Sequence, residues 1–382
     1  MRIAISTGGG DAPGLNAVIR AVVLAAHQRG WQCYGIRRGF GGLLGNDGIM
    51  TLNSAAVRGI THLGGTILGT TNRGNPFRWA TPQADGSLAE VDRSEDLVAA
   101  FRASGFDALV SIGGDGSLKI AHDLWKQGLP VVGVPKTIDN DVEGTLVTFG
   151  FDSAVTTATE AIDKLHTTAE SHDRVMVVEL MGRDAGWIAL NSAVSASADI
   201  VLLPEIPFDI ARVCEAIRHR EATGRHYSIV VVAEGARPID GDTLLVERRA
   251  AGTVDRLGGI GSRVAAAIAE RTGKETRTLV LGHLQRGGSP TTFDRLLALR
   301  FGAAAVRAIA AGQFGSMVAY TPPTISTVPL AKVIGRTKYV PLDSDTIQTA
   351  RDIGISLGPR FSTFINNPCS KLETTNTHFS RD

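Results

Sequence analysis

Two short polar loops contain the residues of this chain that are best suited to chemistry. The first, Gly113–Ser117, reads Gly-Gly-Asp-Gly-Ser, and the second, Pro135–Asp141, reads Pro-Lys-Thr-Ile-Asp-Asn-Asp. Glycine backbone can approach a polyphosphate closely, and the Asp115 carboxylate can meet a magnesium ion that bridges phosphate oxygens. In the second loop, one of Asp139 and Asp141 could accept a hydroxyl proton while the other orients a group or binds metal. Together the two loops indicate phosphoryl transfer.

Each loop follows an apolar run that predicts a buried strand. Residues 107–112 precede the first loop, a helical pattern over 118–125 follows it, and residues 129–134 precede the second loop. This order predicts a β-α-β unit whose loops lie at the carboxyl ends of adjacent parallel strands, where open α/β sheets bind ligands. Either loop alone is more often an ordinary turn, since Gly, Asp and Asn are common turn residues. Two such loops on consecutive strands favour a site.

Composition narrows the class of protein. The chain has 382 residues, of which 43% are hydrophobic, enough for two domains with cores of their own. Its net charge of +1 gives no indication that the protein binds nucleic acid or an anionic membrane. Cys33, Cys214 and Cys369 are far apart and fit neither a disulfide framework nor a zinc cluster. The first six residues predict a strand rather than a secretory signal, and no run approaches a membrane span, so we expect a reduced, cytoplasmic protein.

Strands and helices are predicted to alternate along most of the chain. Further strands are expected at 3–6, 32–36, 175–180, 200–203, 228–232 and 278–282, and helices near 185–197, 209–222, 258–272 and 292–311. Alternation of this length predicts two doubly wound α/β domains with mainly parallel sheets and an active-site cleft between them. We expect a flexible loop at 39–45, an exposed excursion at 78–92 and a mobile tail from Asn366.

Two further glycine loops lie in the first third of the chain. Thr7–Gly14 opens a helix, with Pro13 expected in its first turn. Gly64–Gly74 contains Arg73, which could reach a phosphate, although a solvated surface arginine is the alternative. Neither loop has the G-x-G-x-x-G fingerprint, and the chain contains no G-x-x-x-x-G-K-[ST], so a Rossmann dinucleotide site and a P-loop are both unsupported.

The second half supplies basic residues at predicted strand ends. Arg174 and Arg277 lie at the starts of predicted strands, whereas Arg183 and Arg286 lie just after the ends of strands. Glu234 likewise follows the strand predicted at 228–232. A guanidinium on a rigid element can clamp the phosphate of a sugar in a bidentate fashion. Any one of these arginines is more often a member of a surface ion pair, so the hypothesis depends on the set.

Five motifs resemble those of the phosphofructokinase family, which phosphorylates fructose 6-phosphate at its 1-hydroxyl. In chain order they are Gly9–Gly14, Gly113–Gly116, Thr137–Asp141, Met181–Arg183 and Gly282–Pro290, and the resemblance extends from Thr7 to about Gly315. It implies that Asp139 is the general base, that Asp115 positions Mg²⁺ and that Arg183 stabilises the transferring phosphoryl group. Asp141, the second carboxylate of its loop, remains a catalytic candidate beside Asp139 and Arg183.

The resemblance also implies which residues bind each substrate. Those for the nucleotide phosphates would be Gly10, Arg73, Gly74, Gly114, Asp115, Gly116 and Ser117. Those for the sugar phosphate would be Thr137, Ile138, Asp139, Met181, Gly182, Arg183, Glu234, His283, Leu284, Gln285 and Arg286, with Arg174 and Arg277 from a neighbouring subunit. A homotetramer or homodimer follows. The donor domain would comprise 1–150 plus about 285–335, and the sugar-phosphate domain 151–284 plus about 336–382.

The identity of the phosphoryl donor depends on two positions. Pyrophosphate-dependent members resemble this chain in having a lysine at the place of Lys136, but they have an aspartate at the place of Gly116. The combination of Lys136 with Gly116 resembles the mixed-type subgroup of the family, which includes ATP users. Glycine leaves room for the α-phosphate of ATP, which an aspartate would crowd and repel, so we expect ATP with Mg²⁺. The alternatives are a pyrophosphate-dependent enzyme, a kinase of another sugar phosphate, and an inactive sugar-phosphate-binding regulator. Allosteric members have arginines four apart on their first helix, whereas here Arg20 is followed by Leu24, which disfavours effector control of that type.

Overall fold

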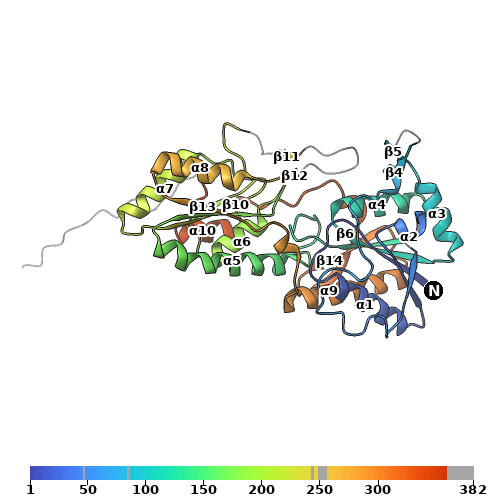
Figure 1. Ribbon diagram of the computed structural model, residues 1–382. Coiled ribbons are helices and arrows are strands. Elements are labelled where there is room, and N and C mark those ends of the chain that lie inside the picture. The colour runs from blue at the N-terminus through green and yellow to red at the C-terminus, as the bar shows by residue number, and fades with distance from the viewer. Residues whose placement is uncertain (46–47, 84–86, 242–244, 248–255, 359–382) are drawn as a thin grey trace, which may run out of the picture.

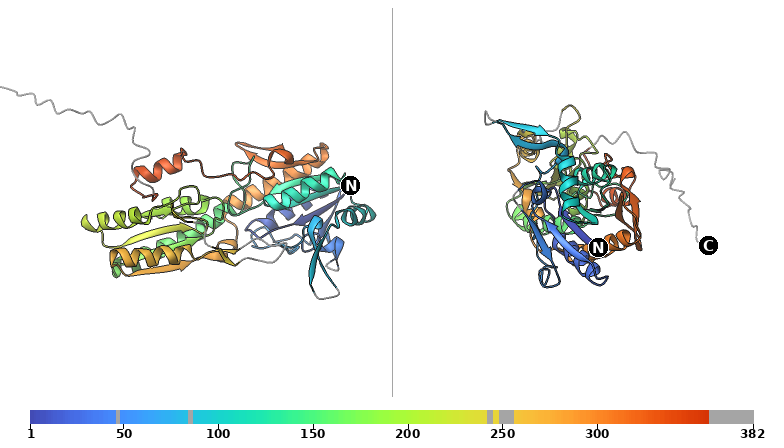
Figure 2. Two further views of the ribbon diagram at one scale, coloured as in Figure 1. Left: turned by 90° about the horizontal axis from the view of Figure 1, so that it is seen from above. Right: turned by 90° about the vertical axis from the view of Figure 1, so that its right-hand side faces the viewer.

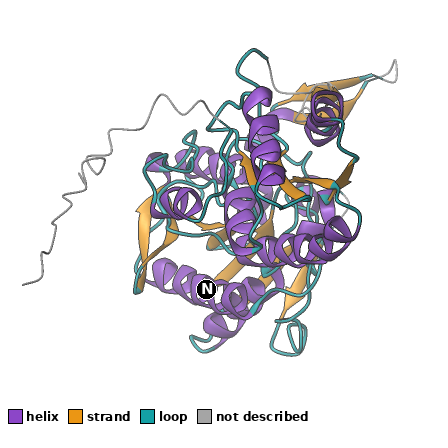
Figure 3. Cartoon of the chain, turned by 90° about the vertical axis from the view of Figure 1, so that its left-hand side faces the viewer, coloured by secondary structure: helices purple, strands orange, loops and turns teal. Residues whose placement is uncertain are grey.

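The computed structural model describes residues 1–45, 48–83, 87–241, 245–247 and 256–358. Two lobes, each built on its own sheet, lie end to end, with the N-terminus at the far end of the first (Figure 1). Viewed from the side of the second lobe, strands lie between helices in the middle of the molecule, and further strands lie at its margin (Figure 3). Among the described residues, no helix is both long and apolar enough to span a membrane.

The first lobe contains a seven-stranded sheet in the order β15-β14-β7-β6-β1-β2-β3. Its strands are β1 (Arg2–Thr7), β2 (Gln32–Ile36), β3 (Ile49–Leu52), β6 (Ala108–Gly113), β7 (Val131–Pro135), β14 (Ser316–Thr321) and β15 (Thr324–Pro329). The five inner strands are parallel and the two edge strands are antiparallel. The loops after β6 and β7 therefore end side by side, which confirms the β-α-β unit predicted around them.

Helices cover both faces of this sheet because its strand residues alternate in direction. Ile3 and Ile5 pack toward α1 (Leu15–His27) and α9 (Thr292–Ala310), whereas Ala4 packs toward α3 (Ser94–Ala103) and α4 (Asp115–Lys126). Both faces are buried, as a mainly parallel sheet requires. The helix that follows the first glycine loop begins at Leu15, so Pro13 lies before its first turn rather than within it.

The second lobe contains a four-stranded parallel sheet in the order β13-β8-β10-β9. Its strands are β8 (Val175–Leu180), β9 (Ile200–Leu202), β10 (Ser228–Ala233) and β13 (Thr276–Val280). One face packs on α5 (Phe151–Ser171), α6 (Trp187–Ser195) and α10 (Asp345–Asp352), and the other on α7 (Ile210–Ala222) and α8 (Ile260–Thr272). These layers confirm a doubly wound α/β fold.

The chain passes between the lobes more than once. After β13 it returns to the first lobe for α9, β14 and β15, and α10 then packs on the second lobe (Figure 2). Shorter elements outside the two main sheets include η1 (Pro76–Arg78), η2 (Gly282–Arg286), η3 (Leu330–Lys332) and the antiparallel pair of β11 (Leu245–Glu247) with β12 (Arg256–Leu257). The mobile tail expected from Asn366 lies outside the described residues.

Three helices differ from the sequence-based expectations, among them α10, which had no predicted counterpart. Residues 41–44 form the short helix α2 (Gly41–Leu44) inside the segment expected to be a flexible loop. The 21-residue helix α5 had no predicted counterpart. Its buried positions include Ala154, Ala158 and Ala169, and alanines at helical spacing give a weak hydrophobic pattern because they bury little apolar area each.

The excursion expected at 78–92 is a β-hairpin, and most of its described residues are exposed, as predicted. Its strands β4 (Trp79–Pro82) and β5 (Leu88–Val91) pair in antiparallel fashion. Phe77 and Trp79 pack against the hydrophobic cluster between the first sheet and α3 and α4. The base of the hairpin is therefore part of the first lobe.

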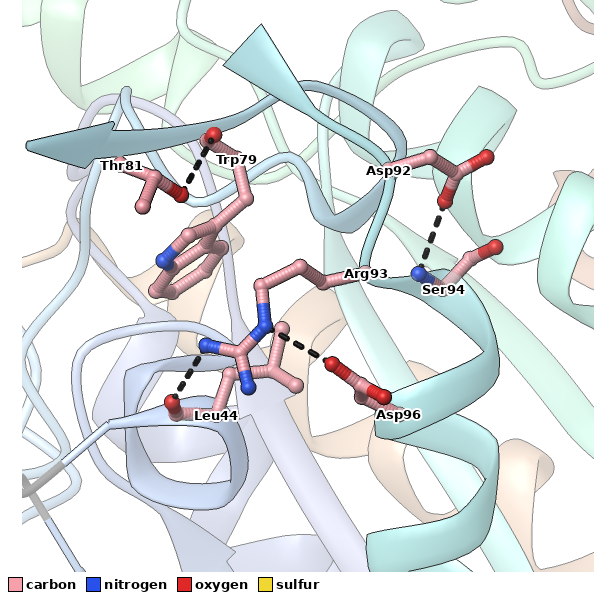
Figure 4. Close-up of polar contacts among 7 residues, drawn as sticks. All are labelled: Leu44, Trp79, Thr81, Asp92, Arg93, Ser94 and Asp96. Atoms are coloured by element: carbon pink, nitrogen blue, oxygen red, sulfur yellow. Dashed lines mark hydrogen bonds and ion pairs between the residues drawn. The ribbon is translucent and has the colours of Figure 1, made fainter. Parts of the chain in front are cut away.

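Arg93 fastens the end of this hairpin to two helices (Figure 4). Its Nε donates to Asp96 Oδ2 at 2.9 Å in α3, and its Nη1 donates to the carbonyl of Leu44 at 3.1 Å, the last residue of α2. The Asp92 carboxylate accepts the amide of Ser94 at 2.8 Å at the start of α3. A single side chain thus ties the excursion to the loop after β2.

Candidate active site

The glycine loops of the first lobe surround one cavity. Its volume is about 760 Å³, and it lies where β1, β6 and β7 end. The lining residues are Ser6, Gly8, Gly9, Gly10, Gly39, Phe40, Thr71, Asn72, Arg73, Gly74, Asn75, Ser111, Gly114, Asp115, Gly116, Ser117, Ile120, Lys136, Thr137 and Arg286. All seven residues predicted for the nucleotide phosphates are among them, so the fold brings together loops that lie far apart in the sequence.

Backbone hydrogen bonds hold these loops against one another. Gly8 donates to the carbonyl of Ile112 at 2.9 Å, and Gly9 donates to that of Thr71 at 3.1 Å. A side chain at Gly113 would collide with Ser117, because its Cβ would lie 2.2 Å from that of the serine. Glycine is therefore required where β6 turns into α4, and the first-turn amides of α4 are left facing the cavity as an anion site.

Lys136 places a buried cation beside the first glycine loop. Its side chain is 3% exposed, and its Nζ donates to the carbonyl of Gly10. Burial, and after it the charge of Arg286, lower the pKa of Lys136 to about 8, although nearby carboxylates oppose the change. Arg286 reaches the same loop from η2: its Nη1 donates to the carbonyl of Asp11 at 3.1 Å, and a Cβ on Gly10 would lie 2.6 Å from that nitrogen. Two cations thus converge on one end of the cavity.

Asp139 is a carboxylate with the properties of a proton acceptor. Burial, and after it the negative charges of Asp141 and Glu234, raise the pKa of Asp139 to about 7, although the positive charges of Arg286 and Lys136 oppose the rise. Its Oδ1 is buried and has no hydrogen-bond partner among the described residues. Such an oxygen is available to a substrate hydroxyl, and a pKa near 7 suits a general base at neutral pH.

Thr137 orders the rest of this loop. Its hydroxyl accepts the amide of Asp139 at 3.1 Å and bonds to the carboxylate of Asp141, and its carbonyl accepts the hydroxyl of Thr148 at 2.8 Å. Burial raises the pKa of Asp141 despite these bonds. Ile138 is fully buried, so it anchors the loop in the core and does not face solvent.

Glu234 and Arg183 lie on two loops of the second lobe that pack together. The amide of Gly235 donates to the carbonyl of Gly182 at 3.1 Å, and a side chain at Gly235 would come within 1.8 Å of the carbonyl of Arg183. Burial raises the pKa of Glu234, and the charges of Arg286 and Arg183 oppose that rise. Met181 directly follows β8 and precedes this loop. The predicted sugar-phosphate residues after β8 and β10 thus share one surface.

The motif after β13 is split between the core and the surface. Gln285 is fully buried, and its amide nitrogen donates to the carbonyl of Gly282 at 3.2 Å, so it shapes η2. His283 and Leu284 are exposed, and Arg286 points back to the first glycine loop. This motif therefore links the second lobe to the cavity of the first.

The side chains of Arg174 and Arg277 both form ion pairs with the carboxylate of Glu275 in the same chain. Arg174 Nε lies 2.9 Å from Glu275 Oε2, and Arg277 forms an ion pair with the other oxygen of Glu275. The side chain of Arg277 is 57% exposed, on the strand at the edge of the second sheet. Both guanidinium groups thus gather near the outer edge of that sheet.

Asp115 fits a magnesium ion that arrives with a nucleotide. Its carboxylate lines the cavity, and its Oδ1 accepts the amide of Gly335 at 3.1 Å. The described part of the chain has no cluster of three or more His, Cys, Asp or Glu side chains that could hold a metal by itself. Mg²⁺ is commonly bound by one or two carboxylates together with substrate phosphates and water, so a single carboxylate that lines this cavity suits it.

Several lining residues were not predicted from the sequence. Ser6, Gly39, Phe40, Asn72, Asn75 and Ile120 carry no charge and belong to no recognisable motif. Only the glycine content of 39–45 could have suggested that segment, since glycine permits close approach of a ligand. Their place in the cavity follows from how strands β1, β2 and β6 align.

Known proteins show the same organisation. A family model described as Phosphofructokinase matches residues 2–309. The chain is 52% identical to the ATP-dependent 6-phosphofructokinase of Chloroflexus aggregans over 94% of this chain and 98% of that one. It is 50% identical to ATP-dependent 6-phosphofructokinase 1 of Synechocystis sp., with the same shares covered.

Solved structures support this relationship. The T-state phosphofructokinase of Pichia pastoris superposes with a TM-score of 0.74 at 31% identity, covering 92% of this chain and 36% of that chain. The pyrophosphate-dependent phosphofructokinase of Nitrosospira multiformis has the same fold, with a TM-score of 0.76 at 21% identity over 99% of this chain and 98% of that one. The family match, the close relatives and the converging loops lead to one conclusion: this chain belongs to the phosphofructokinase family.

Proposed function

We propose that the protein transfers the γ-phosphoryl group of ATP to the 1-hydroxyl of fructose 6-phosphate, forming fructose 1,6-bisphosphate and ADP in glycolysis. The observation that carries this proposal is Asp139, an acceptor with a raised pKa and a free buried oxygen beside a cavity lined by glycine loops. The relatives at about half identity are named for ATP-dependent phosphorylation of this kind.

The proposed reaction balances a proton and a phosphoryl group. The 1-hydroxyl gives its proton to Asp139 as its oxygen forms a bond to the γ-phosphorus, and the bond from that phosphorus to the β–γ bridging oxygen breaks, so that ADP leaves. Arg183 and Lys136 would stabilise the charge on the transferring and leaving oxygens. Bound Mg²⁺, held through Asp115, would neutralise negative charge on the β- and γ-phosphates.

Gly116 favours ATP over pyrophosphate as the donor. It is the second residue of α4 and lines the cavity, and a Cβ at this position would meet no atom within 4 Å. The space beyond it is thus available to a third phosphate. Lys136 would suit a pyrophosphate leaving group, but its contact with the carbonyl of Gly10 gives it a place beside the first glycine loop for either donor.

A donor and acceptor panel tests the proposed function. With Mg²⁺ present, we expect rapid turnover of fructose 6-phosphate with ATP and at least tenfold lower kcat/KM with pyrophosphate, because Gly116 would leave room for the α-phosphate and ATP can use binding contacts that pyrophosphate lacks. Coupled assays of both donors against fructose 6-phosphate and other sugar phosphates measure this. A higher kcat/KM with pyrophosphate than with ATP would contradict the assignment of the donor. A higher kcat/KM with another sugar phosphate than with fructose 6-phosphate would contradict the assignment of the acceptor. Binding of fructose 6-phosphate without turnover would favour the inactive regulator, which the retention of Asp115, Asp139 and Arg183 argues against.

We further propose that the protein is cytoplasmic and forms a homo-oligomer, which is at least a dimer and is expected to be a homotetramer. Arg174 and Arg277 would then bind the sugar phosphate in the active site of a neighbouring subunit. Exposed apolar side chains support an interface near these arginines: Val280 is 53% exposed at the end of β13, and Leu284, in η2, is 68% exposed.

The two free cysteines in the described residues, Cys33 and Cys214, are buried, which suits a reducing compartment.

Subunit mixing tests the shared site. We expect Arg277→Ser and Asp139→Ser each to be nearly inactive alone at low fructose 6-phosphate, but a mixture unfolded and refolded together to regain about a quarter of wild-type activity. Half of random dimers would be hybrids, and each hybrid would have one intact site out of two. Wild type refolded with Asp139→Ser is the control. A mixture that stays inactive while this control recovers, or an active monomer by light scattering, would contradict the proposal.

A further inference from the structure

Residues 335–340, here called the crossing segment, join the first lobe to the second. They follow η3 in the first lobe and precede α10, which packs on the second. The amide of Gly335 donates to Asp115 Oδ1 at 3.1 Å, and the amide of Lys338 donates to the carbonyl of Asp141 at 2.9 Å. The crossing segment therefore contacts both polar loops of the first lobe.

The same segment is bound to the loop that carries Arg183. The indole nitrogen of Trp187 donates to the carbonyl of Lys338 at 2.8 Å. Glu205 accepts two amides with one carboxylate, that of Val340 at 2.9 Å and that of Gly186 at 2.9 Å. Since Gly186 and Trp187 end the Arg183 loop, the crossing segment links that loop to the loop of Asp139.

The ammonium group of Lys338 lies at the centre of this junction. Its Nζ donates to Asn140 Oδ1 at 2.8 Å, to the carbonyl of Leu146 at 2.9 Å and to that of Thr145 at 3.1 Å. It also lies 5.5 Å from the centroid of the Trp187 ring, within the range of a cation–π contact. All three donors of the ammonium are thus used.

Asn140 adopts a left-handed turn that its side-chain contacts help to hold. It lies between the two carboxylates with φ of +53°, a region that few residue types other than glycine and asparagine adopt readily, and it is 3% exposed. Its Oδ1 accepts the Lys338 ammonium and also the amide of Thr148 at 3.2 Å. A turn at this position directs the flanking residues, so the direction of the Asp139 side chain depends on the conformation of Asn140.

We propose that Lys338 is a positioning residue for the phosphoryl-transfer site, which holds Asn140 in the left-handed turn and thereby aims Asp139 at the acceptor hydroxyl. This inference rests on the proposed function. Burial lowers the pKa of Lys338 to about 8, while the nearby Glu143 and Asp141 oppose that change, so the group stays mainly charged at neutral pH. Lys338 does not line the cavity described above, so its effect reaches the chemistry through Asn140.

Replacement of Lys338 by methionine tests the proposal. The variant keeps an unbranched side chain over Trp187 but removes all three donors. We expect kcat to fall at least tenfold, with the KM values for ATP and fructose 6-phosphate within about threefold of wild type, because the loops that bind phosphate remain. Lys332→Met is the matched control, since Lys332 is an exposed lysine six residues earlier. Equal kcat in the two variants would overturn the proposal.

A double-mutant cycle separates positioning from general stability. Glycine adopts the left-handed conformation without help from a side chain. In an Asn140→Gly background, we therefore expect Lys338→Met to lower kcat less than threefold further. Losses that multiply in the double variant would show that Lys338 does not act through Asn140, and would overturn the proposal.

A structural readout does not depend on catalysis. In the crystal structure of Lys338→Met we expect φ of Asn140 to leave the left-handed region, whereas Lys332→Met should keep it. If the wild type fails to phosphorylate fructose 6-phosphate but this change is seen, the proposed function is wrong and the role of Lys338 in the turn stands. An unchanged turn would overturn the inference. If Lys338→Met does not fold, Lys338→Gln takes its place, and failure of both would show a role in stability alone, which also overturns it.

Discussion

Asp139→Ser should lower kcat by about 10²-fold or more while KM for fructose 6-phosphate stays within a few-fold of wild type. The carboxylate accepts a proton only as the phosphoryl group transfers, so its loss acts mainly in the transition state. Serine is small and polar, and the amide of residue 139 can still donate to Thr137 Oγ1 as it does now at 3.1 Å. Steady-state kinetics with saturating ATP measure the effect, and a near-normal kcat would rule out Asp139 as the base.

The pH dependence provides an internal check on this assignment. Because burial raises the pKa of Asp139 to about 7, the proton-accepting form predominates above that pH and is lost below it. Wild-type kcat/KM should therefore decline as pH falls through about 7, and this decline should be absent from the residual activity of Asp139→Ser. Asp163→Ser, at an exposed position of α5, is the control and should keep the wild-type profile.

Gly116→Asp should reduce kcat/KM with ATP by well over tenfold, while activity with pyrophosphate holds or appears. The added carboxylate would extend into the cavity, close to the proposed place of the α-phosphate, where it takes up volume and repels negative charge. Pyrophosphate has no third phosphate to place there. Steady-state kinetics with each donor on both proteins measure this, and unchanged ATP activity would contradict the role of Gly116.

The fold itself should tolerate this substitution. Gly116 lies in the first turn of α4, where an acidic side chain interacts favourably with the helix dipole, and its φ is outside the left-handed region. Gly116→Asn adds the same volume without the charge, so the difference between the two variants measures repulsion alone. Equal ATP losses in both would assign the effect to volume rather than to charge.

Much of the fold and of the donor loops could be predicted before the structure. Apolar runs of strand length alternate with helical patterns, and the structure confirms the strands predicted around the two polar loops. Gly113–Ser117 and Lys136 were predicted to meet because the carboxyl ends of adjacent parallel strands share one edge of a sheet. Helix α5 was not predicted because alanines form much of its buried face, and each alanine buries little apolar surface area.

The sequence by itself determined the chemical groups of the site: two carboxylates around Asn140, a carboxylate at Asp115, and glycines where a side chain would block a phosphate. These depend on residue type and on spacing within one loop, both of which are local. Only the tertiary structure decided which distant residues complete the site. The crossing segment has no motif, yet Lys338 reaches Asn140 from 198 positions away, and Arg286 reaches Asp11 from 275 away. Such contacts depend on how the two lobes pack together. The hydrophobic periodicity of the sequence predicts individual helices and strands, but it does not predict that packing.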